Sequence, residues 1–412
     1  MAAALEGITV LDLSQGAAGP TCAMYLGDLG AEVVKVEPPG GEWGRGLGPP
    51  FVEGIAAAFL GMNRSKRSIV VDLKQDGGAE VLLRLAERCD VVLESFRPGV
   101  ADRLGVGYEA MAARNPRVVY CAISAFGQVG SWRLRPGVDG IAQAMSGIMS
   151  VTGTADGPPV KVGTPAADMV GGVFATQAIL AALFARERTG LGQRADVSLL
   201  ESLLALQLVP MSMYLSSGDQ PQRLGSAAAY AAPNEAFTTS DGHVMVAAYT
   251  PKRWPALCQV LGRPELATDP RFDTNEKRVR ERPALNEVLG PLFATRTTDE
   301  WIAELEEADI LCGPLLSYEQ LLAEPHIAEA GSLVTVEHPM VGPVTAPGCP
   351  SRLSLDERAP VRPPPPIPGE HTREVLTELG FDAHEIDELA THGVVVPPEN
   401  PNGDTAEQGA RT

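Results

Sequence analysis

Residues 8–37 decide the fold. They read Ile8-Thr-Val-Leu-Asp-Leu-Ser14, the loop Gln15-Gly-Ala-Ala-Gly-Pro20, a helical stretch at Thr21–Leu29, and Glu32-Val-Val-Lys-Val-Glu37. The two outer segments are short and rich in aliphatic residues, as strands are. Two such strands joined by a helix are typical of a parallel β-α-β unit, because parallel strands need a crossover between them.

The same alternation of strands and helices continues to residue 215. Further strands are expected at Ser68–Leu73, Asp90–Leu93, Arg117–Ser124 and Arg194–Ser198, and helices at Gly78–Arg88, Ala101–Arg114, Pro165–Glu187 and Leu199–Leu215. Because most of these strands are continuously apolar, helices are expected to cover both faces of the sheet. The pattern predicts an α/β fold with a Rossmann-like parallel sheet in a large first domain.

The loop Gln15–Pro20 matches the phosphate-binding turn of dinucleotide folds only in part. An acid, Glu37, stands where Rossmann enzymes bind the ribose. However, Ala18 replaces the glycine that lets the backbone approach a pyrophosphate, and Pro20 removes an amide donor. We therefore favour a plain strand-to-helix turn over a nicotinamide-binding site.

A change in composition marks a boundary near residue 225. Residues 216–232 are rich in serine, glycine and alanine, and a turn-strand pattern follows at Ser240–Ala247. A proline run at Ala359–Pro368 is expected to be extended. The expected division is a large domain at 1–224, a smaller α+β domain at 225–330, a further section at 331–396 and a disordered tail at 397–412.

Charge and cysteine usage exclude several classes of function. A net charge of −19 argues against a nucleic-acid partner, since phosphates need facing cations. The six cysteines form no Cys-x-x-Cys pair, which suits a reducing cytoplasm and argues against a zinc or disulfide framework. His384-Glu385 lacks the second histidine of a zinc motif. Neither a signal peptide nor a membrane span is expected.

Asp168 is the leading candidate for chemistry. It stands almost alone in the first turn of an apolar helix, which Thr164 is expected to cap, and Gly171 and Gly172 follow it closely. No histidine precedes His243, so a local Ser-His-Asp or Cys-His device is excluded and a carboxylate is the obvious actor. The reference pKa near 3.9 predicts an anion at neutral pH. A purely structural role at the helix N-terminus stays open.

Basic residues collect at Asn63-Arg-Ser-Lys-Arg67, and Lys74, Arg97 and Arg103 follow. Cations that lie shortly after the strands of a parallel sheet are placed to hold phosphates, although many charge runs are simply solvated. Asp139, in Pro136-Gly-Val-Asp-Gly140, is interpreted as a helix N-cap.

Several segments occur together in an order that is specific to one family. They are Gly7–Ser14, Ala18–Pro20, Leu29–Pro38, Asn63–Ile69, Asp90–Gly99, Gly137–Gly147, Pro368–Thr372 and Leu379–Phe381. On these segments the chain resembles the class III CoA-transferases, the formyl-CoA/carnitine CoA-transferase (CaiB/BaiF) family. The resemblance covers roughly residues 5–396.

The resemblance implies an interlocked homodimer, in which each chain has a Rossmann-like large domain, a small domain and a C-terminal segment that returns to the large domain. It also implies that Asp168 is the nucleophile. Positions matching the CoA site are Val71, Asp72, Leu73, Lys74, Ser95, Phe96, Arg97 and Arg103, and possible active-site lining residues are Gln15, Ala17 and Asp139.

The predicted reaction moves CoA from an acyl-CoA thioester to a carboxylic acid through aspartyl anhydride and thioester intermediates. Coenzyme A is then a substrate, and no cofactor or metal is expected. Two alternatives stay open. One is an acyl-CoA racemase or epimerase of the same superfamily, although Val138 stands where the racemases have a histidine. The other is a non-catalytic CoA-ester-binding protein. The donor and acceptor acids are left open.

Overall fold

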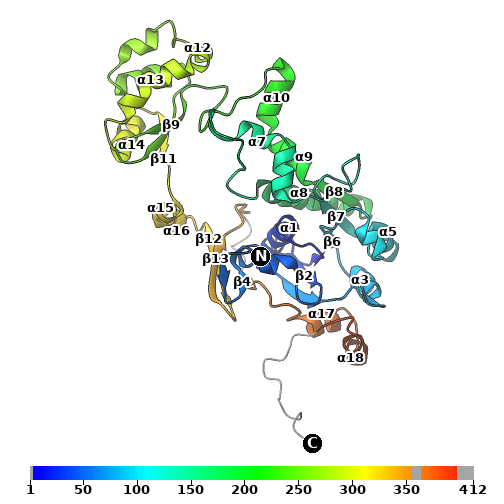
Figure 1. Ribbon diagram of the computed structural model, residues 1–412. Helices are drawn as coiled ribbons and strands as arrows, with labels where there is room; N and C mark the ends of the chain where they lie inside the picture. The colour runs from blue at the N-terminus through cyan, green and yellow to red at the C-terminus, as the bar shows by residue number, and fades with distance from the viewer. Residues whose placement is uncertain (1–2, 355–362, 397–412) are drawn as a thin grey trace, which may run out of the picture. The chain divides into compact units, whose positions relative to one another are not determined.

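The computed structural model describes residues 3–354 and 363–396 of the chain (Figure 1). Its main element is a six-stranded sheet in which all neighbouring strands run parallel. The strand order is β5-β2-β1-β6-β7-β8, with β1 at Thr9–Asp12, β2 at Glu32–Glu37, β5 at Arg67–Val70, β6 at Val91–Glu94, β7 at Val119–Ser124 and β8 at Arg194–Ser198. The predicted α/β fold with a parallel sheet is confirmed.

Helices cover both faces of this sheet, because successive side chains of a strand point to opposite sides. On one face, strand residues such as Leu11 form a core with α3 (Gly78–Ala86) and α5 (Tyr108–Arg114). On the other face, α1 (Ala18–Asp28) packs against α8 (Ala166–Thr189), which also contacts β7 and β8. The strands are therefore buried on both sides.

The remaining elements connect or extend this framework. In the first half they are η1 (Trp43–Gly46), β3 (Phe51–Val52), β4 (Ile55–Ala56), α2 (Ala57–Met62), α4 (Val100–Arg103), α6 (Asp139–Met145), α7 (Ile148–Val151), α9 (Leu199–Leu206) and α10 (Leu208–Ser217). Later in the chain they are β9 (Asn234–Thr238), β10 (His243–Ala247), α11 (Arg253–Val260), η2 (Pro264–Thr268), α12 (Asn275–Arg280), α13 (Arg282–Phe293), α14 (Thr298–Glu307), β11 (Leu311–Pro314), α15 (Tyr318–Ala323), α16 (Pro325–Glu329), β12 (Leu333–His338), β13 (Gly342–Pro347), α17 (Thr372–Glu378) and α18 (Ala383–Thr391).

Two helices that were expected to be continuous are broken. The stretch 101–114 is divided between α4 and α5 at Gly105, whose φ of +75° ends a helix. The stretch 199–215 is divided between α9 and α10, which are bent by 74°. Pro210 explains this bend, because its ring clashes with the carbonyl four residues earlier and it has no amide to donate.

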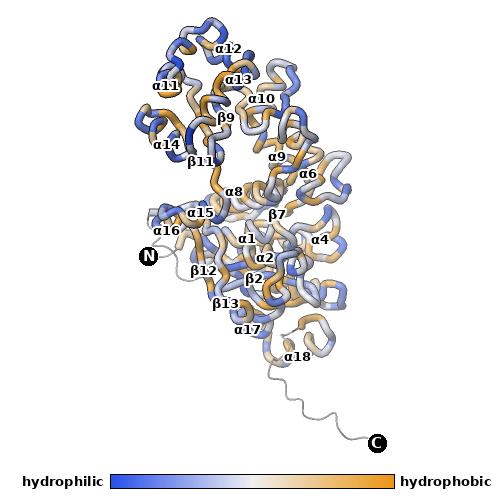
Figure 2. Tube along the Cα trace, turned by 60° about the vertical axis from the view of Figure 1, so that its left-hand side comes forward, coloured by the Kyte–Doolittle hydropathy of each residue, from blue (hydrophilic) through white to orange (hydrophobic). Residues whose placement is uncertain are grey.

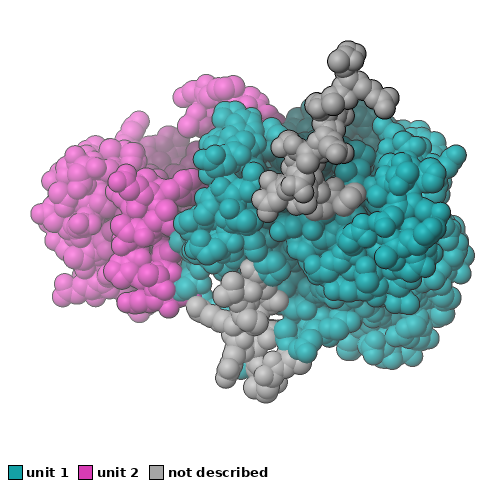
Figure 3. Space-filling view, turned by 90° about the horizontal axis from the view of Figure 1, so that it is seen from below, with its two compact units in different colours: residues 1–146, 163–208, 331–412 teal, residues 147–162, 209–330 magenta. Residues whose placement is uncertain are grey.

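The chain divides into two compact units, which Figure 3 colours separately. The first comprises Met1–Ser146, Gly163–Leu208 and Gly331–Thr412, and the second comprises Gly147–Val162 and Val209–Ala330. Segments 147–162 and 209–224 thus pack with 225–330. Arg223 joins them, because its guanidinium donates to the carbonyl oxygens of Thr154 and Gly157.

The second unit has a core of its own. Its antiparallel sheet has the order β11-β10-β9, and helices α11, α13 and α14 contribute to the same hydrophobic cluster. Phe293 lies at the centre of this cluster, stacked on Phe237 and tilted against Trp301. Strands and helices of this unit thus share one hydrophobic core.

Residues after 331 belong to the first unit. Arg67 of β5 pairs with Glu374 and Glu378 of α17, and Val71 forms a β-bridge with Val395. Residues 359–362 of the proline run and the tail predicted to be disordered (397–412) lie outside the described residues.

One helix, α8, is long and apolar enough to cross a membrane by length and composition, and the bent pair α9 and α10 passes the same test together. However, 44% of the apolar window of α8 is buried inside the protein, and the helix packs on α1, β7 and β8 as a core helix does. The expectations that no segment spans a membrane and that the protein is cytoplasmic stay predictions.

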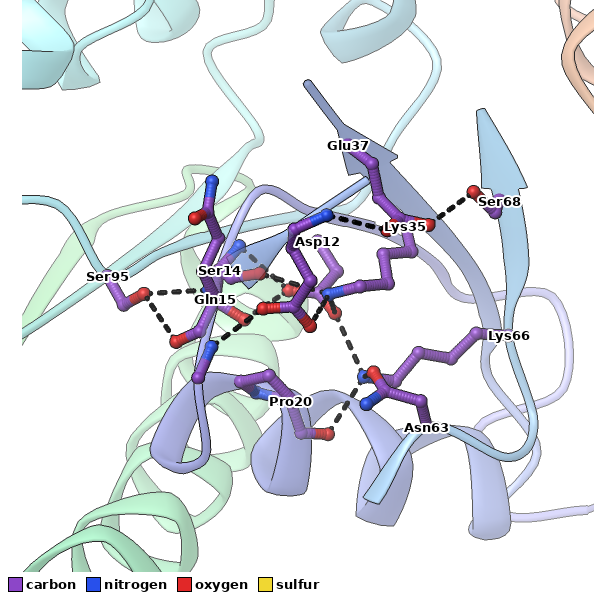
Figure 4. Close-up of polar contacts among 12 residues, drawn as sticks. Asp12, Ser14, Gln15, Pro20, Lys35, Glu37, Asn63, Lys66, Ser68 and Ser95 are labelled. Atoms are coloured by element: carbon purple, nitrogen blue, oxygen red, sulfur yellow. Dashed lines mark hydrogen bonds and ion pairs between the residues drawn. The ribbon is translucent and has the colours of Figure 1, made fainter. Parts of the chain in front are cut away.

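A buried cluster of charges joins the end of β1, the interior of β2 and the start of β5 (Figure 4). Asp12 accepts hydrogen bonds from the ammonium of Lys66 at 3.1 Å and from the hydroxyl of Ser14. Lys35 lies 2.9 Å from Glu42 Oε1 and donates to the carbonyl of Ser14 at 3.1 Å. The side chains of Asp12, Lys35, Lys66 and Glu42 are all fully buried.

The charges in this cluster depend on one another. Burial acts to raise the pKa of Asp12, but the ammonium groups of Lys66 and Lys35 outweigh it and lower that pKa. Burial lowers the pKa of Lys66 to about 8, and Asp12 opposes the fall. Because water reaches none of these groups, removing one partner leaves the other charge buried and uncompensated.

We predict that Lys66→Met lowers the free energy of unfolding by about 3–5 kcal/mol at pH 7, because Asp12 loses its nearest cation. Lys252→Met is the matched control, since the ion pair of Lys252 with Asp309 is exposed and its loss is expected to change stability by at most about 1 kcal/mol. Denaturant unfolding of both variants checks the prediction, and equal effects would contradict it.

Candidate active site

The sheet has one point at which its strand order reverses. From β1 the chain builds outward through β2 and β5 on one side, and then through β6, β7 and β8 on the other. In parallel sheets, ligands bind outside the carboxyl ends of the strands at such a switch point. A pocket of about 250 Å³ lies there, lined by Gln15, Ala17, Ala18, Trp43, Ser95, Phe96, Ile123, Ser124, Ala125, Gly137, Val138, Asp168 and Leu199.

Asp168 enters this pocket from the first turn of α8. The helix begins at Ala166, with Pro165 rather than Thr164 in the N-cap position, so the expected cap is wrong by one residue. Gly171 and Gly172 let α8 approach its neighbours. A Cβ on Gly172 would lie 2.7 Å from the carbonyl oxygen of Ala18. Two glycines therefore bring the head of α8 against α1, next to the ends of the strands.

Asp139 caps α8 from another helix. It is the first residue of α6, with Val138 in the N-cap position, so its interpretation as an N-cap of its own helix is wrong. Its carboxylate accepts hydrogen bonds from the backbone N–H of Ala167 and from Nε2 of Gln143, both at 2.8 Å. Asp139 itself is buried and is not among the residues that line the pocket.

The environment of Asp168 disfavours its charge. Burial and the nearby carboxylate of Asp139 raise the pKa of Asp168 to about 7. The reference pKa near 3.9 predicted that Asp168 is fully ionised at neutral pH. With a pKa of about 7, only about half of the Asp168 carboxyls are ionised there. A carboxyl that titrates near 7 in a pocket is the kind of perturbed group that active sites contain.

The loop after β1 forms another wall of the pocket. Ser95, which follows β6, clamps this loop, because its hydroxyl accepts from the backbone N–H of Gln15 at 2.9 Å and lies 3.2 Å from the carbonyl oxygen of Gln15 (Figure 4). Gln15, Ala17 and Ser95 thus lie around the same pocket as Asp168. The resemblance matched Ser95 to the CoA site and made Gln15 and Ala17 possible lining residues, and these roles stay predictions.

The other positions matched to the CoA site have different surroundings. Phe96 lines the pocket, whereas Arg97, Arg103 and Lys74 are exposed and form no ion pair within residues 3–354 and 363–396. Val71 is buried under the β-bridge with Val395. Asp72 accepts a hydrogen bond from the backbone N–H of Lys74 at 2.9 Å, and Leu73 packs at the margin of the core.

The basic run 63–67 does not supply free cations. Arg64 pairs with Asp28, Lys66 is buried against Asp12, and Arg67 pairs with acids that include Glu374. The carboxylate of Glu37 is also paired, because it accepts hydrogen bonds from the guanidinium of Arg45 and the hydroxyl of Ser68. Glu37 is therefore not free to bind a ribose. The acid that accompanies the glycine-rich loop in dinucleotide-binding folds has no counterpart here.

Sequence reasoning did not mark some of the residues that line the pocket, Trp43 and Ser124 among them. Trp43 lines it from η1, and no local pattern marked that residue. Ser124, at the end of β7, also lines the pocket, and its buried hydroxyl has no hydrogen-bond partner within the described residues. Val138 lines it with an aliphatic side chain, which cannot carry the proton that the histidine of a racemase would carry.

Comparison with proteins of known function extends this description. The mouse succinyl-CoA:glutarate CoA-transferase is 39% identical over 393 residues, which cover 95% of this chain and 90% of that protein. The acetyl-CoA:oxalate CoA-transferase of Acetobacter aceti is 39% identical over 351 residues, which cover 85% of this chain and 89% of that protein.

Solved structures and a family model agree with these relatives. A CaiB/BaiF family protein from Brucella suis superposes with a TM-score of 0.82 at 36% identity, covering 92% of this chain and all of that one. The model of CoA-transferase family III matches residues 5–372, a stretch that contains the whole pocket around Asp168. The chain therefore belongs to CoA-transferase family III.

Proposed function

We propose that this protein is a CoA-transferase that moves CoA between dicarboxylic acids, with Asp168 as the nucleophile. The CoA-transferase activity is supported by relatives that align over most of the chain. The acid class is supported by their names, because glutarate and oxalate are both dicarboxylic acids. The observation that carries the role of Asp168 is its place in the pocket at the switch point, with a pKa raised to about 7.

The transfer proceeds through exchanges at one carboxyl. An Oδ of Asp168 attacks the thioester carbonyl carbon, the C–S bond breaks with its electrons on sulfur, and an acyl-aspartyl anhydride and CoA thiolate result. The thiolate then attacks the aspartyl carbonyl, which releases the first acid and leaves an aspartyl-CoA thioester. The acceptor carboxylate attacks the carbonyl carbon of that thioester, the C–S bond breaks with its electrons on sulfur, and a second anhydride and CoA thiolate result. Attack of the thiolate on the acceptor carbonyl yields the new CoA ester and restores the Asp168 carboxylate.

Each step replaces one activated acyl bond by another, so no ATP and no net proton are required. The difficulty lies in orienting and desolvating a weak nucleophile, and positioning alone is worth about 7–11 kcal/mol in favourable cases. A buried carboxylate is also more basic than a free one, which strengthens its attack. The backbone N–H groups of Gly171 and Gly172 cannot stabilise the oxyanion that forms when the carbonyl is attacked. Both residues lie inside α8, where these groups donate to carbonyl oxygens of the helix itself.

CoA is expected to lie along the carboxyl edge of the sheet. Ser95 and Phe96 at the pocket would meet the thioester end, while the exposed cations Arg97, Arg103 and Lys74 would meet the phosphates. Lys74 follows β5, which is three strands from β6 in the sheet. Three strand spacings are roughly 14 Å, a span that an extended cofactor can bridge.

The protein is further proposed to act as an interlocked homodimer. Large apolar side chains on the outer helices support a partner: Val173 and Phe184 of α8, and Leu204 and Leu206 of α9, are all more than one-third exposed. These helices also carry hydrophobic stretches in Figure 2. Light scattering that gives the mass of a single chain at micromolar concentration would contradict this proposal.

We predict that Asp168→Asn lowers kcat on the order of 10³-fold or more, because an amide cannot form the anhydride. Wild-type protein incubated with succinyl-CoA and hydroxylamine is expected to become inactive and to carry a hydroxamate at Asp168, as peptide mass spectrometry would show. Omission of succinyl-CoA should prevent both. An active Asp168→Asn variant, or labelling at another acid, would refute the assignment.

The thermal stability of Asp168→Asn shows whether this variant still folds. Since the pKa of Asp168 is raised in the folded state, that state holds a proton between about pH 4 and pH 7 that the unfolded chain has lost, and stability falls as the pH rises through this window. Asp168→Asn is therefore expected to melt no lower than the wild type at pH 8. Thermal unfolding at pH 5 and pH 8 separates lost chemistry from lost structure.

We also predict that kcat/KM for the CoA ester falls about tenfold per pH unit below pH 7 and is flat above it, because only the Asp168 anion reacts. Asp139→Asn keeps an oxygen to accept from the N–H of Ala167 but removes the negative charge, so the apparent pKa is expected to fall. Its activity at pH 6 relative to pH 8 should then exceed that of the wild type. Asp299→Asn, at an exposed acid, should leave the profile unchanged.

A further inference from the structure

A close contact between Trp43 and Gly16 shapes the pocket. Gly16 has a φ of +86°, a conformation that favours glycine. A Cβ at this position would lie 2.5 Å from Cζ2 of Trp43. The indole thus lies directly over the backbone of the loop, in the space that a side chain at position 16 would occupy.

Buried charges hold this indole in place. Glu42 precedes Trp43, and its Oε2 accepts from the backbone N–H of Gly16 at 2.7 Å while its Oε1 lies 2.9 Å from the ammonium of Lys35. On the other side, Arg45 makes two hydrogen bonds of 2.6 Å to the carboxylate of Glu37. Glu42 and Arg45 therefore anchor the segment from which the indole extends over Gly16.

The side chain of Trp43 is much larger than those of Ala17 and Ala18, which lie next to Gly16 in the loop after β1. Ala17 and Ala18 line the pocket with small side chains beside Gly16, so Trp43 and Gln15 are the large side chains that limit its width on this side. The indole is also 55% exposed, which leaves much of its surface free to contact a substrate. A large, exposed aromatic group that lines the same pocket as the proposed nucleophile is suited to contact what that nucleophile binds.

We propose that Trp43, positioned by Gly16 and Glu42, sets the size of the acid that the enzyme accepts. The inference rests on the proposed role of Asp168. Because every acid is attached to Asp168 in turn, the acyl group that leaves and the acid that arrives occupy the same space. Trp43 therefore limits donor and acceptor alike, and a smaller residue would relax the limit for both.

The test compares two acceptor acids of different width, oxalate and 2-phenylsuccinate, with succinyl-CoA as the common donor. The ratio of their kcat/KM values reports only the acceptor, because the donor half-reaction is shared. Trp43→Ala is expected to raise the ratio of 2-phenylsuccinate to oxalate at least tenfold, and Trp43→Phe to change it much less. Tyr318→Ala, at an aromatic residue that is 85% exposed, is the matched control and should leave the ratio unchanged.

Trp43→Leu provides a second test if the alanine variant does not fold, since it keeps apolar volume over Gly16 and should raise the ratio to an intermediate value. An active Trp43→Ala or Trp43→Leu enzyme with the wild-type ratio would overturn the inference. So would a shift of equal size in Tyr318→Ala. A wild-type protein that transfers CoA to neither acid nor to glutarate would instead refute the proposed function, which is a separate result.

Discussion

The structure depends above all on the buried charge cluster around Asp12. Asp12 ends β1, Lys35 lies within β2, and Lys66 directly precedes β5, so the cluster joins three neighbouring strands and reaches the loop after β1 through Asp12. A sheet of apolar strands would tolerate small shifts between neighbours. Ionic groups that no water reaches do not, because any displacement leaves a charge without its partner. The cluster thus anchors the start of the loop after β1, where Lys35 donates to the carbonyl of Ser14.

This rigidity is transmitted to the site through one carboxylate. Glu42 contacts Lys35 of the cluster with one oxygen and the N–H of Gly16 with the other. The same carboxylate therefore links the core to the pocket wall. A second acid, Asp139, acts similarly from α6, where it caps α8 and disfavours the charge of Asp168. The nucleophile is held between a fixed loop and a capped helix, in a place where its ionised form is destabilised and its reactivity is correspondingly higher.

Much of the fold was predictable from local pattern. Apolar strands alternating with helices predict a parallel sheet, because only such a sheet buries both faces of every strand. Asp168 could be singled out because it is the lone acid at the head of an apolar helix in a half-chain without histidine. The two broken helices were missed since periodicity continues across both breaks, while Gly105 and Pro210 act through backbone geometry. The basic run 63–67 was interpreted as a possible phosphate site. Its charges instead form ion pairs with residues that are distant in the sequence, such as Asp12 and Glu374.

The amino-acid sequence by itself determined the α/β architecture, the family and the identity of the lone acid, because these follow from residue types and their order along the chain. The tertiary structure decided which groups surround that acid. Asp139 approaches α8 from a separate helix, and Trp43 occupies the space over Gly16 from η1. The raised pKa of Asp168 follows from burial and from a charge that lies twenty-nine positions earlier in the chain. Such effects depend on distance in space, which the order of residues does not contain.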